Sequence, residues 1–443
     1  MRGTGSKRAP HAAAAPHAPA AGQRAAGRAA LALVAGVVLL LAVPSCGTGG
    51  GGVPTPEFDV LPSLNEIWAP YFPVGNIVSS VNYSWRPARV ADLGNQAREE
   101  LLVRQFSIIT AEDEMKPDWL RPQPHTWNAA GADRIMAFAQ EHGLRVHGHT
   151  LVWHSQTPAW MYADGDRARS AEAIANMQYH IERVMRHFGD AIESWDVLNE
   201  VFPSTVGGGV SAGNWRNFLR GYSGWLRAIG SNPNGDCFIW IAFTTARRIA
   251  DEINPNMVLY YNDYNLDSAN KRLAVYYMVR EMNERFAREN NGRRLIDAIG
   301  MQAHYHASGQ GSGAAYPWGP TSPGAVGASI QRFASLGLYV SITELDVTIG
   351  NVTLSPRMER QQANLYAQLF QVFRDNAGSI RRVSIWGIDD PASWRARGNP
   401  LLFGSNLRPK EAFWAAANPD AFRRNANAYL ADPKAFIDER FWR

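Results

Sequence analysis

The chain has 443 residues, of which 46% are hydrophobic and 19% are charged, which is the composition of an ordinary globular protein. This composition excludes a disordered chain and a bundle of membrane helices. The formal charge of +4 does not indicate a nucleic-acid partner, because five basic residues precede the first acidic one. Without Arg2, Lys7, Arg8, Arg24 and Arg28, 39 basic residues remain against 40 acidic ones.

The first element is an apolar run, AALALVAGVVLLLAVPSC, from Ala29 to Cys46. Its basic leader, its short core and the small residues at its end predict an export signal over residues 1–46. The ending VPSC resembles a bacterial lipoprotein cleavage box, in which Cys46 becomes the lipidated first residue; ordinary secretion with cleavage nearby is the alternative. We therefore expect an exported protein, either a cell-surface lipoprotein or a secreted one. If Cys46 is lipidated, Cys237 has no disulfide partner.

A Gly- and Pro-rich tether over residues 47–60 precedes a single predicted domain, 61–443. Short apolar, β-rich runs recur along this domain and alternate with segments of helical periodicity. Eight such runs predict a (β/α)8 barrel, that is, a TIM barrel of the α/β class. The runs span 72–79, 106–111, 144–152, 192–200, 257–264, 295–305, 338–347 and 381–390, and the clearest helices span 131–143, 171–189, 270–290 and 355–376. The extension from about residue 419 is expected to form a helix on the outside of the barrel.

Polar and aromatic residues gather at the carboxyl ends of the predicted strands. In a TIM barrel these ends meet at one face, where the active site lies. Solvated strand ends would explain polar residues but not the tryptophans and histidines among them. These residues, in chain order, are Glu112, Lys116, His149, Trp153, His154, Asn199, Glu200, Asn262, Tyr264, Gln302, His304, Glu344, Asp346 and Trp386.

Two carboxylates stand out among these residues. Glu200 lies near the end of the run WDVLNEVF, whose apolar residues should be buried, and burial favours the protonated acid that a proton donor needs. Glu344 in SITELDV is the candidate for a second carboxylate. A pair of carboxylates that flanks a glycosidic bond is what glycoside hydrolysis requires.

Six motifs occur in a fixed order along the chain: GHTLVWH (148–154), WDVLNE (195–200), YYNDYN (260–265), QAHY (302–305), ITELDV (342–347) and WGIDDPASW (386–394). In order and spacing they resemble the glycoside hydrolase family 10 endo-β-1,4-xylanases, and the resemblance extends over about residues 64 to 417. It implies retaining hydrolysis of xylan and xylo-oligosaccharides through a covalent glycosyl-enzyme. No motif in the sequence indicates a metal or another cofactor, and we expect a monomer.

The resemblance also implies roles for individual residues. Glu200 matches the acid/base and Glu344 the nucleophile, which His304 contacts with Asp346 behind it. Asn199 matches the residue that holds the sugar 2-hydroxyl. The implied substrate-binding residues are Glu112, Asp113, Lys116, His149, Trp153, His154, Asn262, Tyr264, Gln302, Trp386 and Trp394, with Asn262 and Tyr264 toward the leaving group. Trp215, Trp225 and Trp240 are expected in the core.

The sequence departs from the family pattern in three places. Asp113 and Pro117 replace an Asn and a Trp, which puts the glycone subsites in doubt. Segments 223–240 and 306–324 look expanded and could reshape the leaving-group side. The tail after Asn418 has no counterpart in the family.

Two other functions remain open from the sequence. One is an enzyme on the same scaffold that cleaves β-1,4-glucan. The other is a surface lipoprotein that binds xylan without cleaving it, although such a protein could dispense with the Glu200 and Glu344 pair.

Overall fold

The computed structural model describes residues 61–83, 91–308, 320–350 and 354–442. The predicted export signal, Cys46 and the tether therefore lie outside the described residues, as does most of the Gly-rich segment 306–324.

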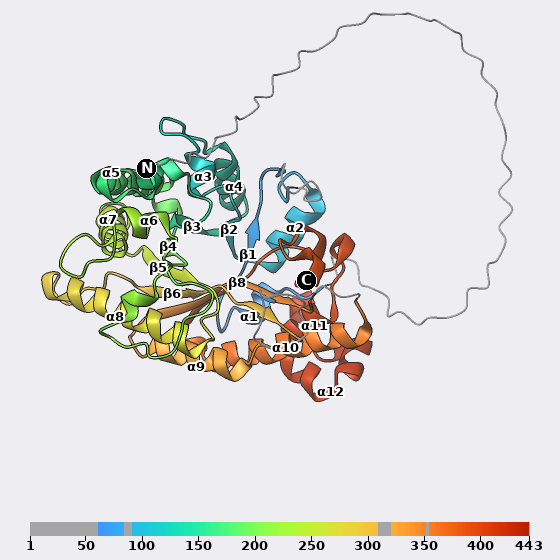
Figure 1. The fold of residues 1–443 in the computed structure, drawn as a ribbon. Coiled ribbons are helices and arrows are strands. Elements are labelled where there is room, and N and C mark those ends of the chain that lie inside the picture. Colours follow the sequence, from blue (N-terminus) through green and yellow to red (C-terminus); the bar gives the residue numbers. More distant parts are fainter. Residues whose placement is uncertain (1–60, 84–90, 309–319, 351–353, 443) are drawn as a thin grey trace, which may run out of the picture. The chain divides into compact units, whose positions relative to one another are not determined.

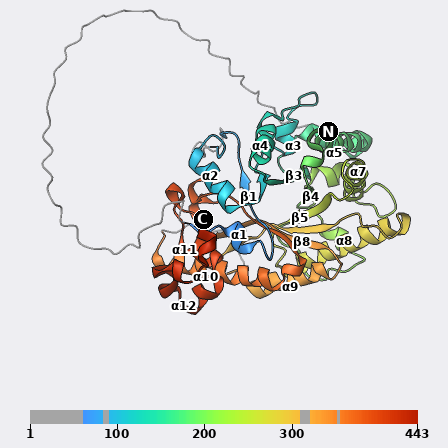
Figure 2. The same ribbon diagram turned by 180° about the vertical axis from the view of Figure 1, so that it is seen from behind.

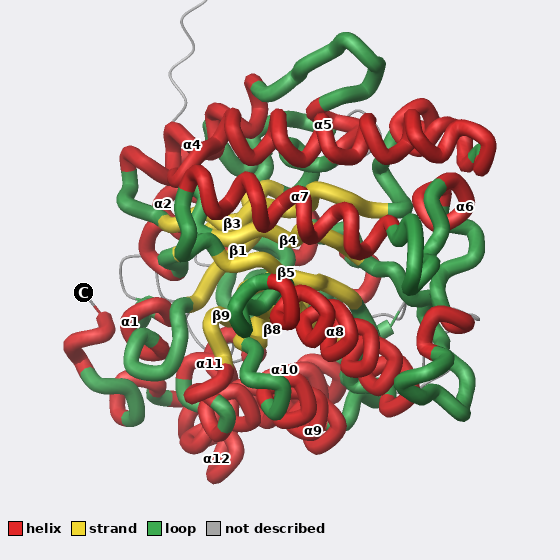
Figure 3. Tube along the Cα trace, turned by 90° about the vertical axis from the view of Figure 1, so that its left-hand side faces the viewer, coloured by secondary structure: helices red, strands yellow, loops and turns green. Residues whose placement is uncertain are grey.

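A closed parallel β-barrel forms the centre of the fold (Figure 3). Each strand pairs with the next one around the barrel, and β1 pairs with both β2 and β9, which closes it. The short β7 extends the β6 position and pairs with β8. The strands are β1 (Val74–Val78), β2 (Ile108–Ala111), β3 (Arg145–Trp153), β4 (Ser194–Asn199), β5 (Val258–Asp263), β6 (Ala298–Met301), β7 (His304–His306), β8 (Tyr339–Thr348) and β9 (Ile380–Ile385). The prediction of a (β/α)8 barrel is confirmed.

Helices surround the barrel and cover the outer face of its strands (Figures 1 and 2). Buried hydrophobic residues from both layers form one large core, and Val258, Tyr260 and Ala298 form a small separate cluster, as expected for parallel strands that are covered on both faces. The helices are α1 (Leu64–Trp68), α2 (Gln96–Gln105), α3 (Pro117–Leu120), α4 (Ala130–Glu141), α5 (Ser170–Phe188), α6 (Gly224–Ala228), α7 (Phe238–Ile253), α8 (Ala269–Glu289), α9 (Pro323–Ala334), α10 (Pro356–Asp375), α11 (Glu411–Ala417) and α12 (Pro419–Ala431). None of the helices in the described ranges combines the length and apolarity needed to span a bilayer.

Local sequence explains where many of these helices begin. Ser63, Asn95, Ser223, Ser322 and Asn418 each precede a helix and accept a hydrogen bond from a backbone N–H of its first turn. Proline occupies the first helical position of four helices, where its missing N–H costs nothing: α3, α9, α10 and α12.

The sixth predicted run, 295–305, differs from the structure. It contains two strands, β6 and β7, separated by Gln302 and Ala303. Ala303 has a φ of +66°, a left-handed conformation that lies outside the β region and interrupts the strand. Because the strand is interrupted at Ala303, the side chains of Gln302 and His304 both reach the site described below.

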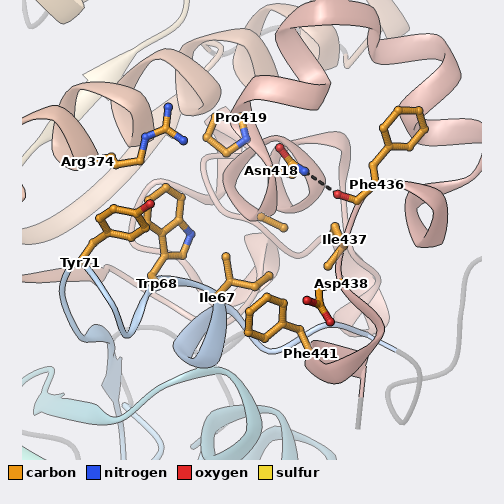
Figure 4. Close-up of a pocket in the computed structure, with 11 residues that line it drawn as sticks. Ile67, Trp68, Tyr71, Arg374, Asn418, Pro419, Phe436, Ile437, Asp438 and Phe441 are labelled. Atoms are coloured by element: carbon orange, nitrogen blue, oxygen red, sulfur yellow. Dashed lines mark hydrogen bonds between the residues drawn. The ribbon is translucent and has the colours of Figure 1, made fainter.

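The tail after Asn418 forms α12, the helix that was predicted there, and then two short 3-10 turns. Asp420 of α12 pairs with Arg374 of α10, and Tyr429 donates to the carbonyl of Trp414 in α11. The tail then returns to the start of the domain, where the Ser63 amide donates to the carbonyl of Phe441 at 2.8 Å. Figure 4 shows Ile67, Trp68 and Phe441 around a small pocket at this junction, closed on one side by the hydrogen bond from Asn418 to Phe436.

Candidate active site

A cleft with a volume of about 460 Å³ opens where the carboxyl ends of the strands meet. Fourteen of the sixteen residues predicted for catalysis and binding line it, from the strands β2 to β9 or the loops that follow them. They are Glu112, Asp113, Lys116, His149, Trp153, His154, Asn199, Glu200, Tyr264, Gln302, His304, Glu344, Trp386 and Trp394. Asn262 and Asp346 are not among the lining residues.

The strand register brings the central residues together. Asn199 at the end of β4 lies beside Trp153 of β3 on one side and Asn262 of β5 on the other. His304 of β7 lies beside Asp346 of β8. Residues that are more than 40 positions apart in the sequence thus become neighbours at one edge of the barrel.

Glu344 of β8 is buried, with 4% of its surface exposed, and two side chains hold its carboxylate. Oε1 accepts a hydrogen bond from Asn262 Nδ2 at 2.8 Å, and Oε2 lies 3.0 Å from His304 Nε2. Both bonds fit an ionised carboxylate whose position is fixed.

His304 bridges two carboxylates, because its other ring nitrogen, Nδ1, lies 3.0 Å from Asp346 Oδ2. Burial on its own lowers the pKa of His304, but Asp346 and Glu344 outweigh it and raise the pKa to about 9. At neutral pH the ring is therefore a cation that donates to both carboxylates.

Asp346 lies behind His304 and holds further groups. It accepts a hydrogen bond from Trp394 Nε1 at 2.9 Å and pairs with Arg395. Burial favours the neutral acid, yet Arg395 and His304 keep the pKa of Asp346 below its usual value. The Trp394 ring packs edge-on against His304, with centroids 4.9 Å apart. Asp346 does not line the cleft itself, but it fixes His304 and Trp394, which do.

Glu200 follows β4 and has a different environment. Gln302 Nε2 donates to its Oε1 at 2.9 Å, and Arg220 Nη2 lies 3.9 Å from Oε2. Burial raises the pKa of Glu200, and Asp263 and Glu344 raise it further, while Gln302 and Arg220 act against them. The two glutamates of one cleft are therefore held in opposite ways, Glu200 toward the acid and Glu344 in an ionic hydrogen-bond network.

Asn262 was predicted to contact the sugar, and the structure places it elsewhere. Its side chain is fully buried, and its Nδ2 donates to Glu344 Oε1 and to Asn199 Oδ1. Its Oδ1 accepts from Thr343 Oγ1 at 2.7 Å. These bonds occupy both N–H groups of the amide and engage its oxygen. Asn262 therefore fixes the Glu344 carboxylate and has no N–H group left for a sugar hydroxyl.

Asp113, the first departure from the family pattern, lines the cleft and is also paired. Its Oδ1 accepts from Lys116 Nζ at 2.7 Å and from Gln156 Nε2 at 3.0 Å. Lys116 also donates to Gln156 Oε1 and lies over the Trp153 ring. The adjacent Lys116 ammonium thus neutralises the additional negative charge of Asp113.

Aromatic rings form the walls of the cleft. Trp386 packs edge-on against both His149 and His304. His149 is itself fixed, since its Nδ1 lies 2.8 Å from Asp196 Oδ2. Burial, together with Arg220 and Lys271, lowers the pKa of His154 to about 3, so that this ring is neutral beside Glu200. The aromatic walls therefore present apolar faces that can pack against the apolar face of a sugar ring, while the polar residues of the cleft are available to its hydroxyl groups.

Six lining residues were missed by the sequence reasoning: Ser155, Gln156, Ser204, Arg220, Tyr222 and Asn265. Ser155 and Gln156 directly follow the motif GHTLVWH, and Asn265 is the last residue of YYNDYN, so that their place next to strand ends was a signal that pointed to them. Ser204, Arg220 and Tyr222 lie on an irregular loop after β4 that has no periodic pattern.

The expanded segment 223–240 contributes no lining residue. Its Trp225 supports the cleft from outside by donating to the carbonyl of Trp153. Trp215 donates to Glu281, and Trp240 packs against Phe286, so that none of the three core tryptophans enters the cleft, as expected. In the part of the chain that the structure describes, no group of His, Cys, Asp and Glu is arranged to hold a metal ion.

A parallel barrel with two differently held carboxylates and aromatic walls at its carboxyl end has the construction of a glycoside hydrolase. The sequence profile of glycosyl hydrolase family 10 matches residues 63–419. The chain belongs to that family.

Several curated relatives align over about four fifths of the chain. A β-1,4-xylanase of Dictyoglomus thermophilum is 34% identical over 371 residues, which cover 80% of this chain and 90% of the relative. An endo-1,4-β-xylanase A of Thermoanaerobacterium saccharolyticum is 33% identical over 81% of this chain, which spans only 28% of that longer relative. An exoglucanase of Acetivibrio thermocellus, XynX, is 32% identical, and this chain spans 30% of it.

Solved structures agree with the fold. Xylanase B from Clostridium stercorarium F9 superposes with a TM-score of 0.67 at 29% identity, covering 81% of this chain and all of that one. A mutant protein in complex with xylotriose superposes with a TM-score of 0.66 at 28% identity, covering 80% of this chain and 99% of that one.

Proposed function

We propose that this protein is a retaining endo-1,4-β-xylanase that cleaves internal bonds of xylan by double displacement. The observation that carries the proposal is the pair Glu200 and Glu344 in one cleft, with burial and Asp263 favouring the acid form of one and His304 and Asn262 stabilising the charged form of the other. Relatives named as xylanases support the substrate class.

In the first step, Glu344 attacks the anomeric carbon, and the bond from that carbon to the leaving oxygen breaks. The leaving oxygen takes the proton of Glu200 and departs as a sugar hydroxyl. Glu344 is then esterified to the glycone, and Glu200 is ionised.

In the second step, Glu200 takes a proton from water while the water oxygen attacks the anomeric carbon. The ester bond to Glu344 breaks, which restores both carboxyl groups to their starting states and leaves the anomeric configuration unchanged. Asn199 and Gln302, which line the cleft beside both glutamates, are placed to hold sugar hydroxyls.

The test combines two variants with added azide. Glu344→Ala should lose the first step on every substrate, at a cost of several kcal/mol of barrier. Glu200→Ala should retain most of its kcat/KM on an aryl xylobioside with an acidic leaving group, because that group needs no proton in the first step, whereas kcat should fall because the second step lacks its base. Azide should then give a β-xylosyl azide with Glu200→Ala and an α-xylosyl azide with Glu344→Ala. If NMR shows that the wild-type enzyme releases a product with inverted anomeric configuration, the retaining mechanism is excluded.

Substrate preference separates xylan from glucan. We expect a much higher rate on xylan than on carboxymethylcellulose, and the reverse order would favour the β-1,4-glucan-cleaving alternative. Absence of hydrolysis together with retained xylan binding would favour a binding protein instead.

For residues 1–46, we propose an export signal that ends at a lipidated Cys46, on the basis of their sequence alone. Cys46→Ala should move activity from the membrane fraction to the soluble fraction without changing kcat. A mature protein that is found free in the medium and begins at another residue would show ordinary secretion.

A further inference from the structure

Arg220 is a buried arginine beside the proposed acid/base, and sequence reasoning assigned it no role. Only 4% of its surface is exposed, and it lines the cleft. Its Nε donates to the carbonyl of Glu200 at 3.0 Å, and its Nη2 donates to the carbonyl of Phe202 at 2.6 Å and to the Tyr264 hydroxyl at 3.0 Å. Its Nη1 donates to the Tyr222 hydroxyl. The guanidinium is thus fixed on several sides.

The backbone of Glu200 needs such support. Its φ is +58°, in the left-handed region that residues with a side chain adopt rarely and at a cost. The Glu200 amide donates to the carbonyl of Asn262 at 2.9 Å, and its carbonyl accepts from Arg220. The chain from β5 and the side chain of Arg220 therefore hold the two backbone polar groups of Glu200 in this conformation.

Arg220 also brings a positive charge to the carboxyl group, with Nη2 at 3.9 Å from Glu200 Oε2. Charged and titratable groups from every neighbouring element face the same site. Asp263 from β5 and Glu344 from β8 favour the protonated form of Glu200, whereas Arg220 favours the ionised form. Lys271 of α8 is paired with Asp263 at 2.7 Å, and the neutral His154 lies 4.0 Å from Oε2.

Both forms of Glu200 are needed in the proposed reaction. We propose that Arg220 is a positioning residue that holds Glu200 in its left-handed conformation and favours the ionised form of Glu200 after the leaving sugar has departed. This proposal rests on the proposed reaction. Without Arg220, the carboxyl group would hold its proton to higher pH, so that at a given pH a smaller fraction of the glycosyl-enzyme would have the ionised Glu200 that accepts the proton of the attacking water.

The first test is the pH dependence of Arg220→Met on two substrates. For xylotetraose, the basic limb of kcat/KM reports loss of the proton from Glu200 in the free enzyme. For 2,4-dinitrophenyl β-xylobioside, the second step limits kcat, and its acidic limb reports protonation of Glu200 in the glycosyl-enzyme. Removing the cation should move both limbs to higher pH, by about one unit.

A second variant separates charge from geometry. Arg220→Lys keeps a positive charge but cannot make the same set of hydrogen bonds to the Glu200 and Phe202 carbonyls. It should leave both limbs near their wild-type positions and lower kcat about 10- to 100-fold. Arg216→Met is the matched control, because Arg216 lies four residues away, packs on Trp215 and pairs with Glu281 outside the cleft. It should leave both limbs and kcat unchanged.

Limbs that stay in place in a folded Arg220→Met protein would overturn the charge role, and an unchanged kcat in Arg220→Lys would overturn the role in geometry. Circular dichroism checks that each variant is folded, and if Arg220→Met is not, Arg220→Gln replaces it in the pH test. Wild-type activity on xylan tests the proposed function by itself, so that failure of one proposal is distinguishable from failure of the other.

Discussion

Asn262 donates one hydrogen bond to Glu344 at 2.8 Å and another to Asn199 at 3.1 Å, which ties the proposed nucleophile to a residue on a different strand. A glycine makes this arrangement possible. A Cβ at Gly300 of β6 would lie only 2.3 Å from Asn262 Oδ1. The side chain of Asn262 therefore fills the space that Gly300 leaves open.

We expect Asn262→Ala to lower kcat about 10- to 100-fold with little change in KM, because Glu344 would lose a donor while the sugar would lose no contact. Thr343→Val, which removes the hydroxyl that donates to Asn262, should show a smaller effect in the same direction. Steady-state kinetics on xylotetraose measure both. A rise in KM at constant kcat would instead return Asn262 to the substrate-binding residues.

The stability of the protein should depend on the charge of His304. Its pKa is raised from 6.5 to about 9 in the folded state, so the protonated ring stabilises the fold fully below about pH 6.5, and this contribution is lost as the pH rises through 9. The full contribution is roughly 3 kcal/mol. Denaturant unfolding of wild type and His304→Gln across pH 6 to 10 should show a difference that shrinks with rising pH. A difference that is independent of pH would mean that His304 is neutral.

Asp113→Asn should have two opposite effects. Loss of charge from a buried pair with Lys116 should lower the free energy of unfolding by about 1–2 kcal/mol. The new amide can donate to a sugar hydroxyl, which should strengthen binding of xylotriose by about 0.5–1.5 kcal/mol. Denaturant unfolding and calorimetry measure the two quantities separately.

Asp133→Asn is a suitable control for this change, because Asp133 pairs with His187 at the surface with about half of its side chain exposed. It should alter neither quantity measurably. If Asp113→Asn behaves like this control, the pair with Lys116 contributes neither to stability nor to binding.

Trp394 should help to select pentose over hexose. Its ring packs against His304 at the cleft, and 45% of its surface is exposed. Trp394→Ala should narrow the ratio of kcat/KM for aryl xylosides over aryl glucosides by at least fivefold, since a change of one wall is worth about 1–3 kcal/mol. Trp394→Phe, which keeps an aromatic wall but not the bond to Asp346, should retain most of the ratio. A ratio within twofold of wild type in Trp394→Ala would exclude this role.

The sequence predicts the barrel well because each strand is a short apolar run, a pattern that depends only on burial. The sequence also predicts which residues lie at the strand ends, because the end of an apolar run marks the end of the strand. The end of β4, for example, fixes the positions of Asn199 and Glu200. It does not predict the direction of a side chain, which is why Asn262 was expected in the cleft. Arg220 was missed because its position depends on an irregular loop, whose path is set by contacts with Tyr264 and Glu200 rather than by any periodic pattern.

The described chain begins at the end of the barrel opposite the cleft. Ser63 donates to the carbonyl of Arg104, near the start of β2, and α1 leads into the amino end of β1. The last turn of the tail meets it there, at Phe441. Both ends of the described domain, near Ser63 and Phe441, therefore lie at the base of the barrel, opposite its mouth. A solid support coupled near either end of the described domain would therefore leave the mouth free to meet an insoluble polysaccharide.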